Sequence, residues 1–231
     1  MPKKRKVGSK TVVKSNPSPP TFISGPGVKT LYLIRHGESL GQTARTNGLN
    51  RKSDPTLTDA GLTKRGERQA SSIQEVMGEE RVRGVELIVT SPLTRAVHTT
   101  ILGFGFGCSS PVIVDYDIRE IGSSLPENKG REIDVVLREL GAGEEFLGRL
   151  DATSRRPTSW PGGRDEGGLR RAERVAAVMK GIAGMEGLST VVVVCHHNVI
   201  QSILGKGVKP RNAVPIECEL DVNGVVRLKE S

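Results

Sequence analysis

The sequence has 231 residues, of which 35% are hydrophobic and only 3% aromatic, so a core must be built mainly from Val, Leu, Ile and Ala. The net charge is +8, but residues 1–30 hold seven basic residues and no acidic one, which leaves the remainder close to neutral. A nucleic-acid-binding domain would carry its basic excess on the folded part, so this distribution argues against nucleic acid as a partner. No apolar run reaches the roughly 18–20 residues of a membrane span.

Three cysteines stand without paired or metal-type spacing, which predicts a reducing compartment and no zinc site. No apolar segment near the start has the form of a secretory signal. We therefore expect an intracellular protein, either nuclear or cytoplasmic.

Residues 1–29 are polar and lack periodicity, so we expect a disordered basic tail followed by one folded domain over residues 30–231. The tail contains a dense basic cluster formed by Lys3, Lys4, Arg5 and Lys6. This cluster resembles a short nuclear-import signal, which an acidic import receptor could bind. Two alternatives stay open: a cloning tag, because Gly8-Ser9 looks like a linker, or part of an organelle transit sequence.

Short apolar runs predict the strands of a buried sheet. In chain order they are Leu31–Ile34, Glu86–Thr90, Pro111–Val114, Thr190–Cys195, Cys218–Asp221 and Val225–Lys229. The dipeptide Asn223-Gly224 separates the last two runs and predicts a hairpin.

Helical signals lie between these strands. A polar loop over residues 41–59 leads to a helix that Thr63 is expected to cap, and Asp54 and Asp59 are interpreted as loop and capping residues. Ser91 and Pro92 are expected to be the N-cap and first position of a second helix. Further helices are predicted over Glu132–Leu140, Leu169–Met185 and Asn198–Leu204.

The alternation of strands and helices predicts an α/β fold with three layers: a doubly wound, mainly parallel sheet with helices on both faces. Two of its strands lead into histidine, at Arg35-His36 and at His196, and a third leads through Ser91 to Arg95. The carboxyl ends of parallel strands meet at one edge, so these side chains are expected to converge. Two imidazoles and two guanidiniums suit a phosphoryl group, whose negative oxygens need fixed cationic donors.

The sequence is similar to the histidine phosphatase superfamily, the phosphoglycerate-mutase-like proteins. Five segments resemble the family's motifs and stand in the family's order: Arg35-His36-Gly37, Asp59–Ala70, Ser91–Ala96, Ile118-Arg119-Glu120 and Val194-Cys195-His196. Together they cover about residues 30–204.

The resemblance implies a mechanism in which neutral His36 attacks phosphorus and forms a phosphohistidine. Its other ring nitrogen is expected to donate to a backbone carbonyl, which fixes the tautomer. Arg35, Arg95 and His196 are implied to bind the phosphoryl oxygens, and Glu120 to protonate the leaving oxygen and then activate water. No metal or other cofactor is expected, because these side chains supply the positive charge.

Ser39, Gln42 and His197 are further candidates for substrate contact. Gln42 stands where relatives often have a phosphate-contacting Asn. His197 stands where the family commonly has Gly, and this departure is expected to narrow the site. Glu166, in an irregular Pro/Gly-rich stretch, is an alternative proton donor to Glu120.

Three functions fit this site. The first is a phosphomonoesterase, whose substrate would be a phosphorylated small molecule or a phosphoprotein. The second is a phosphoglycerate-type mutase, but mutases of the family carry a long basic segment after the glutamate, whereas residues 121–131 offer only Lys129 and Arg131. The third is a catalytically silent module that binds phosphorylated ligands.

Overall fold

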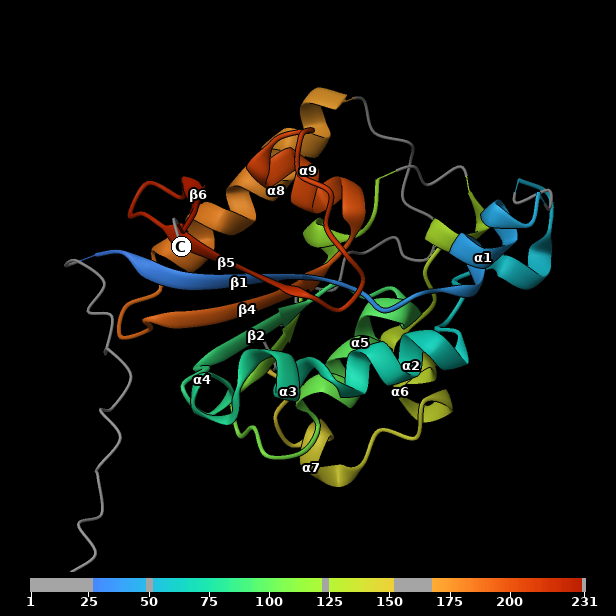
Figure 1. Ribbon diagram of the computed structural model, residues 1–231, viewed down its shortest axis with the longest axis horizontal. Coiled ribbons are helices and arrows are strands. Elements are labelled where there is room, and N and C mark those ends of the chain that lie inside the picture. The colour runs from blue at the N-terminus through green and yellow to red at the C-terminus, as the bar shows by residue number, and fades with distance from the viewer. Residues whose placement is uncertain (1–26, 49–51, 122–124, 152–167, 230–231) are drawn as a thin grey trace, which may run out of the picture.

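The structure is a computed structural model that describes residues 27–48, 52–121, 125–151 and 168–229 (Figure 1). The strands are β1 (Lys29–Arg35), β2 (Leu87–Thr90), β3 (Val112–Val114), β4 (Thr190–Cys195), β5 (Pro215–Leu220) and β6 (Val226–Leu228). The basic cluster at Lys3–Lys6 and the candidate Glu166 lie outside the described residues. Lys29, which the sequence places in the tail, is the first residue of β1.

The α-helices are α1 (Leu40–Thr46), α2 (Lys64–Ser71), α3 (Ile73–Met77), α4 (Glu79–Arg83), α5 (Thr94–Phe104), α6 (Ile133–Glu139), α7 (Glu144–Leu147), α8 (Gly168–Ala183) and α9 (His197–Leu204). Three short 3₁₀ helices complete the described elements: η1 (Pro55–Leu57), η2 (Tyr116–Ile118) and η3 (Pro126–Asn128).

The six strands form one mixed, mainly parallel sheet in the order β3-β2-β4-β1-β5-β6. The four strands from β3 to β1 are parallel. In the final hairpin, β5 pairs antiparallel with β1, and β6 pairs antiparallel with β5. Figure 1 shows α8 and α9 on one face and helices α2 to α7 on the other. The α/β three-layer prediction is therefore confirmed, and so is the hairpin around Asn223-Gly224.

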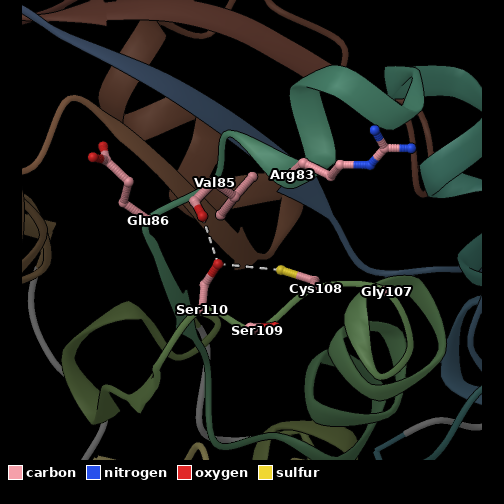
Figure 2. A pocket seen from close by; sticks show the side chains of 7 residues that line it. All are labelled: Arg83, Val85, Glu86, Gly107, Cys108, Ser109 and Ser110. Atoms are coloured by element: carbon pink, nitrogen blue, oxygen red, sulfur yellow. Dashed lines mark hydrogen bonds between the residues drawn. The ribbon is translucent and has the colours of Figure 1, made fainter.

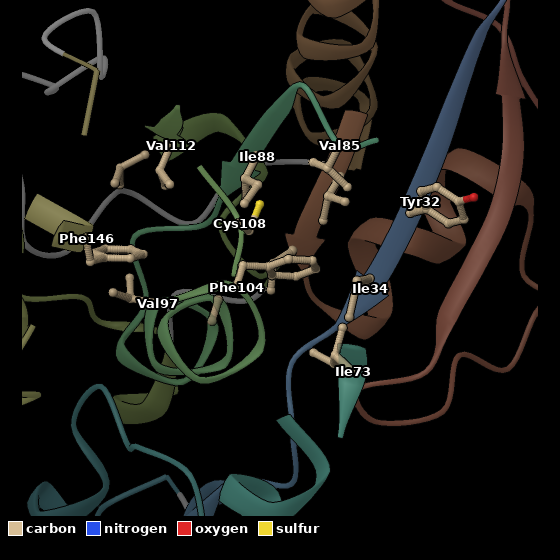
Figure 3. Close-up of a cluster of buried hydrophobic side chains, with 14 of the residues drawn as sticks. Tyr32, Ile34, Ile73, Val85, Ile88, Val97, Phe104, Cys108, Val112 and Phe146 are labelled. Atoms are coloured by element: carbon tan, nitrogen blue, oxygen red, sulfur yellow. The ribbon is translucent and has the colours of Figure 1, made fainter. Parts of the chain in front are cut away.

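The central strands are apolar on both sides because helices cover both faces of the sheet. On β1, Tyr32 and Ile34 pack toward α3 and α5, where Phe104 is fully buried (Figure 3). The alternate residues, Leu31 and Leu33, pack into a second cluster with α8 and α9. A slip of one residue would exchange the two faces, so packing fixes the register of β1 against β4.

That register brings three strand ends together. Ile34 lies opposite Val194 on β4, and Thr90 on β2 lies opposite the same residue from the other side. The backbone N–H of His36 donates to Cys195 O at 3.0 Å, and that of Ser91 donates to Val194 O at 3.0 Å. The loops that follow β1, β2 and β4 therefore start side by side.

The structure corrects the interpretation of two local segments. The predicted loop over 41–59 contains α1, because Ser39 and Gln42 form a reciprocal capping box at its start. The second helix begins at Thr94 rather than directly after Ser91, and its N-cap residue, Leu93, provides no side-chain hydrogen bond. Ser91 is not that cap, because its hydroxyl lies against a histidine ring in the site described below.

Candidate functional site

The loop after β1 lies close against the start of α2. A Cβ atom on Gly37 would overlap the carbonyl of Gly66, and one on Gly66 would overlap the backbone of Glu38. Both positions therefore need glycine for close approach of two backbones. Gly37 N also donates to Thr99 Oγ1 on α5 at 3.0 Å, so the loop that carries His36 is held by two helices.

His36 is buried, and its two ring nitrogens have different partners. Nδ1 lies 2.6 Å from the Gly37 carbonyl oxygen, which can only accept, so Nδ1 carries the proton. Nε2 accepts a hydrogen bond from Arg95 Nε at 3.2 Å. Burial lowers the pKa of His36 well below its ordinary value, and the charge of Arg95 acts in the same direction. The ring is therefore neutral, with its lone pair on Nε2.

Arg95 lies in the first turn of α5 and is buried. Besides His36, its guanidinium donates to the Glu127 carbonyl and to Asn128 Oδ1 at 2.9 Å. Both acceptors belong to residues of η3. Each nitrogen of Arg95 thus has its own acceptor, and the side chain is held in one orientation.

His196 directly follows β4 and is fully buried. Its ring centroid lies 5.1 Å from that of His36, with 58° between the ring planes. Nε2 is 2.6 Å from Ser91 Oγ, whereas Nδ1 is buried without a hydrogen-bond partner. Burial and the nearby charge of Arg95 lower its pKa well below the ordinary value.

Arg35, the last residue of β1, is partly buried on the same side. Its terminal nitrogen donates to the Pro210 carbonyl at 3.1 Å, and its Nε is buried without a partner. Burial lowers its pKa, with Glu120 opposing and Arg95 reinforcing the change. Buried polar atoms without a hydrogen-bond partner are rare in folded proteins, so Arg35 Nε and His196 Nδ1 mark places where a further polar group would fit.

Glu120 follows η2 and reaches the first turn of α9. Its carboxylate accepts hydrogen bonds from the Ile121 N–H at 2.8 Å and from the Asn198 N–H. Burial raises its pKa above the ordinary value of a glutamate, although these hydrogen bonds and Arg95 oppose the change. The charges of Arg35 and Arg95 both act on this carboxyl, which places it in the same electrostatic field as the histidines.

The three further candidates lie near the loop after β1. Ser39 and Gln42 hydrogen-bond each other in the α1 capping box, and their part in substrate contact stays a prediction. His197, the first residue of α9, is partly exposed and has a buried, unpartnered Nδ1. Burial lowers its pKa, and the charges of Arg35 and Arg45 act in the same direction.

Sequence reasoning missed Asn212. Its amide donates to the His36 carbonyl at 2.8 Å and to Gln42 Oε1 at 3.1 Å, while Ala213 N donates to the Arg35 carbonyl at 2.8 Å. The segment before β5 therefore braces the Arg35-His36 backbone. No motif marks this residue in the sequence, because the contact depends on how the final hairpin returns beside β1.

A separate cavity of about 290 Å³ lies at the amino ends of β2 and β3, away from the strand ends that carry the histidines (Figure 2). Two of its side chains are joined there: Ser110 donates to the Val85 carbonyl at 2.5 Å, and Cys108 Sγ lies 3.2 Å from Ser110 Oγ. Glu86 accepts hydrogen bonds from Ser189 and Thr190. The Ser110 hydroxyl and the Glu86 carboxylate that line this cavity are therefore engaged in hydrogen bonds within the protein.

Among the described residues, no group of three or more His, Cys, Asp and Glu side chains could hold a metal ion. All three cysteines are free and buried. None of the helices in the described part of the chain has the length and apolar character needed to cross a membrane.

Comparison with known proteins agrees with the motifs. The profile of the histidine phosphatase superfamily (branch 1) matches residues 31–229. The chain therefore belongs to the histidine phosphatase superfamily.

Two relatives by sequence carry different names. A probable phosphatase of Schizosaccharomyces pombe is 37% identical over 76 residues, which are 33% of this chain and 32% of that protein. A probable phosphoglycerate mutase of Yersinia pestis is 31% identical over 109 residues, 47% of this chain and 45% of that protein. The matches thus span less than half the length of either relative.

Solved structures share the fold at low identity. The ecdysone phosphate phosphatase of Bombix mori, in complex with tungstate, has a TM-score of 0.62 at 14% identity and covers 88% of this chain and 92% of its own. A phosphoglycerate mutase of Bacillus anthracis has a TM-score of 0.55 at 18% identity with the same coverage. These likenesses concern the fold, and they include both phosphatases and mutases.

Proposed function

We propose that this chain is a phosphomonoesterase that acts through a phosphohistidine on His36. The observation that supports this most directly is the state of the imidazole. Nδ1 is bound to the Gly37 carbonyl, the ring is neutral, and Nε2 presents its lone pair beside Arg95. A neutral imidazole held in this way is a competent nucleophile, and a guanidinium next to it can hold the group that is attacked.

In the first step, the Nε2 lone pair forms a bond to phosphorus while the bond from phosphorus to the ester oxygen breaks. Arg95 exchanges its hydrogen bond to Nε2 for one to a phosphoryl oxygen. Arg95, Arg35 and neutral His196 donate to the phosphoryl oxygens and stabilise the charge that gathers there. The unpartnered Nε of Arg35 is available for this purpose, and so is the unpartnered Nδ1 of His196 in the tautomer that carries its proton on Nδ1 and accepts from the Ser91 hydroxyl at Nε2.

Glu120 completes both steps. In its protonated form, which burial favours, it gives its proton to the leaving ester oxygen. The resulting carboxylate then takes a proton from water as the water oxygen attacks phosphorus. The N–P bond breaks, its electron pair returns to Nε2, and inorganic phosphate leaves.

Hydrolysis is preferred over mutase activity because of the short segment after Glu120. Of its two cations, Arg131 forms ion pairs with Asp59 and Glu139, so it is engaged within the protein. Lys129 is exposed, and it is the remaining cationic side chain of residues 125–131. A mutase must retain and reorient a phosphorylated intermediate, for which this segment offers little positive charge.

The experiment is hydrolysis of p-nitrophenyl phosphate by the full chain, with His36→Ala as the control, followed by 3-phosphoglycerate. We expect phosphate release by the wild type and loss of at least about a thousandfold in His36→Ala. Isomerisation of 3-phosphoglycerate without phosphate release would establish the mutase instead. Binding of phosphate esters without turnover would leave a silent module.

A further inference from the structure

Asp59 has an unusual backbone conformation for a buried residue. Its side chain is almost wholly inaccessible, with 1% exposure, and its φ angle is +48°. Only one other non-glycine residue in the described ranges, Ala213, has a positive φ. This region costs an L-residue about 1–2 kcal/mol, so the surrounding contacts must hold Asp59 there.

The side chain of Asp59 makes these contacts with Thr94, the first residue of α5. Asp59 Oδ1 accepts from the Thr94 N–H at 2.9 Å, and Oδ2 accepts from the Thr94 hydroxyl at 2.6 Å. The carboxylate thus supplies the cap that Leu93 does not provide, from 35 residues earlier in the chain. Arg131 reinforces the pair, because it contacts Asp59 Oδ2 at 3.4 Å and Thr94 Oγ1 at 3.2 Å.

The backbone of Asp59 is tied to the segment that holds Arg95. Its N–H donates to the Pro126 carbonyl at 3.1 Å. The guanidinium of Arg95 donates to the next carbonyl, that of Glu127, and to the side chain of Asn128. Asp59 therefore fixes both the helix end that carries Arg95 and the turn that receives its guanidinium.

We propose that Asp59 is a positioning residue for Arg95: it sets the guanidinium at the place where the phosphoryl oxygens bind. This inference rests on the proposed function, in which Arg95 holds the phosphoryl group. Asp59 does not touch the reacting atoms. Its effect passes through Thr94, the residue directly before Arg95, and through η3.

The test is a double-mutant cycle on the affinity for tungstate, an oxyanion of the shape and charge of phosphate. We expect Asp59→Ala to weaken tungstate binding by about 10- to 100-fold, because small misplacements of a binding group are costly. In an Arg95→Ala background, the same change should have less than about a twofold effect. Asp59→Asn, which can still accept from Thr94 N–H, should recover part of the affinity.

Asp54→Ala is the matched control. Asp54 stands five residues earlier in the same loop and caps η1, accepting from the Thr56 N–H at 2.9 Å and from the Thr56 hydroxyl at 2.5 Å. We expect it to leave tungstate affinity unchanged. Should Asp59→Ala not fold, Thr94→Val removes the hydroxyl contacts with Asp59 and Arg131 but keeps the backbone N–H that donates to Asp59. We expect a smaller loss of the same kind, about threefold to tenfold.

Each outcome decides the inference. Equal affinity in Asp59→Ala and wild type, with or without a lower melting temperature, would overturn it and make Asp59 a cap for the fold alone. An equal loss in both backgrounds would also overturn it, because the effect would not pass through Arg95. If the wild type binds tungstate but hydrolyses no phosphate ester, the proposed function fails while the affinities still decide the role of Asp59. If it binds no tungstate, both fail.

Discussion

The Nε atom of Arg95 lies 3.2 Å from Nε2 of His36, and these two residues are 59 positions apart in the chain. The hydrogen bond joins the candidate nucleophile to the candidate phosphoryl-binding cation. It exists because β1 and β2 both flank β4, so that the loop after β1 meets the helix that follows β2. A phosphoryl group can replace this contact by accepting from Arg95 while Nε2 attacks phosphorus.

Substitution of Arg95 tests whether its geometry matters or only its charge. We expect Arg95→Ala to lower kcat/KM for p-nitrophenyl phosphate by about 100- to 1,000-fold, in the range found when one transition-state donor is removed. Arg95→Lys should recover little, because one ammonium cannot replace three nitrogens with three separate partners. Recovery to near wild-type activity in Arg95→Lys would show that charge alone suffices.

The pH dependence of kcat/KM should be bell-shaped. His36 must be neutral to attack, and its lowered pKa places the acid limb well below pH 6.5. Glu120 must be protonated in the first step, and its raised pKa places the alkaline limb above pH 4.5. We expect Glu120→Gln to abolish the alkaline limb, whereas Glu166→Gln should keep it. The opposite result would identify Glu166 as the proton donor.

The leaving group gives a second test of Glu120. An alkyl phosphate needs a proton on its departing oxygen, whereas p-nitrophenolate leaves readily without one. We expect Glu120→Gln to lower kcat by about 100- to 10,000-fold on an alkyl phosphate and far less on p-nitrophenyl phosphate. Equal losses on both substrates would contradict a role in protonation.

Burial of neutral His36 and His196 makes the stability of the fold depend on pH. Their folded pKa values lie below the unfolded value, so between the two the unfolded chain binds more protons. The free energy of unfolding should therefore rise with pH in that window and fall as the pH drops below about 6.5, by up to about 1.4 kcal/mol per pH unit for each histidine. Urea denaturation from pH 5 to 8 measures this slope, and His36→Gln should reduce it. An unchanged slope would show that His36 is not buried in neutral form.

Close packing at Gly66 is testable through stability. Gly66→Ala would place a methyl group against the Glu38 backbone, and we expect a loss of about 1–3 kcal/mol in the free energy of unfolding. Gly181→Ala is the control, because nothing lies near its Cβ position in α8, and we expect a gain of up to about 1 kcal/mol. Similar effects of both variants in urea denaturation would contradict the close approach.

Much of the fold could be predicted because the signals are local. The apolar runs Leu31–Ile34 and Thr190–Cys195 identify buried strands, and parallel pairing then brings His36 near His196. The contacts that hold the site could not be predicted in this way. Asn212 reaches the His36 carbonyl only because the last hairpin returns beside β1, and no local pattern encodes that return.

The predictions from sequence that the structure corrects failed for similar physical reasons. The seven residues of α1 are too few for periodicity to be informative, and its start is set by the Ser39 and Gln42 capping box. Serine is a residue type common at N-caps, but the hydroxyl of Ser91 is hydrogen-bonded to His196, a residue 105 positions away. Asp59, interpreted from sequence as a loop or capping residue, does accept from a helix N-terminus, but that helix is α5, 35 residues along the chain, and no local pattern indicates the pairing.

The central claim is covalent attack by His36, and rapid-quench trapping of the phosphorylated enzyme tests it most directly. The full chain is mixed with a ³²P-labelled phosphate ester and quenched in alkali, because phosphohistidine survives base and is lost in acid. Peptide mapping should then place one label on His36 in the wild type and none in His36→Ala. A label on any other residue, or full phosphate release by His36→Ala, would contradict the account.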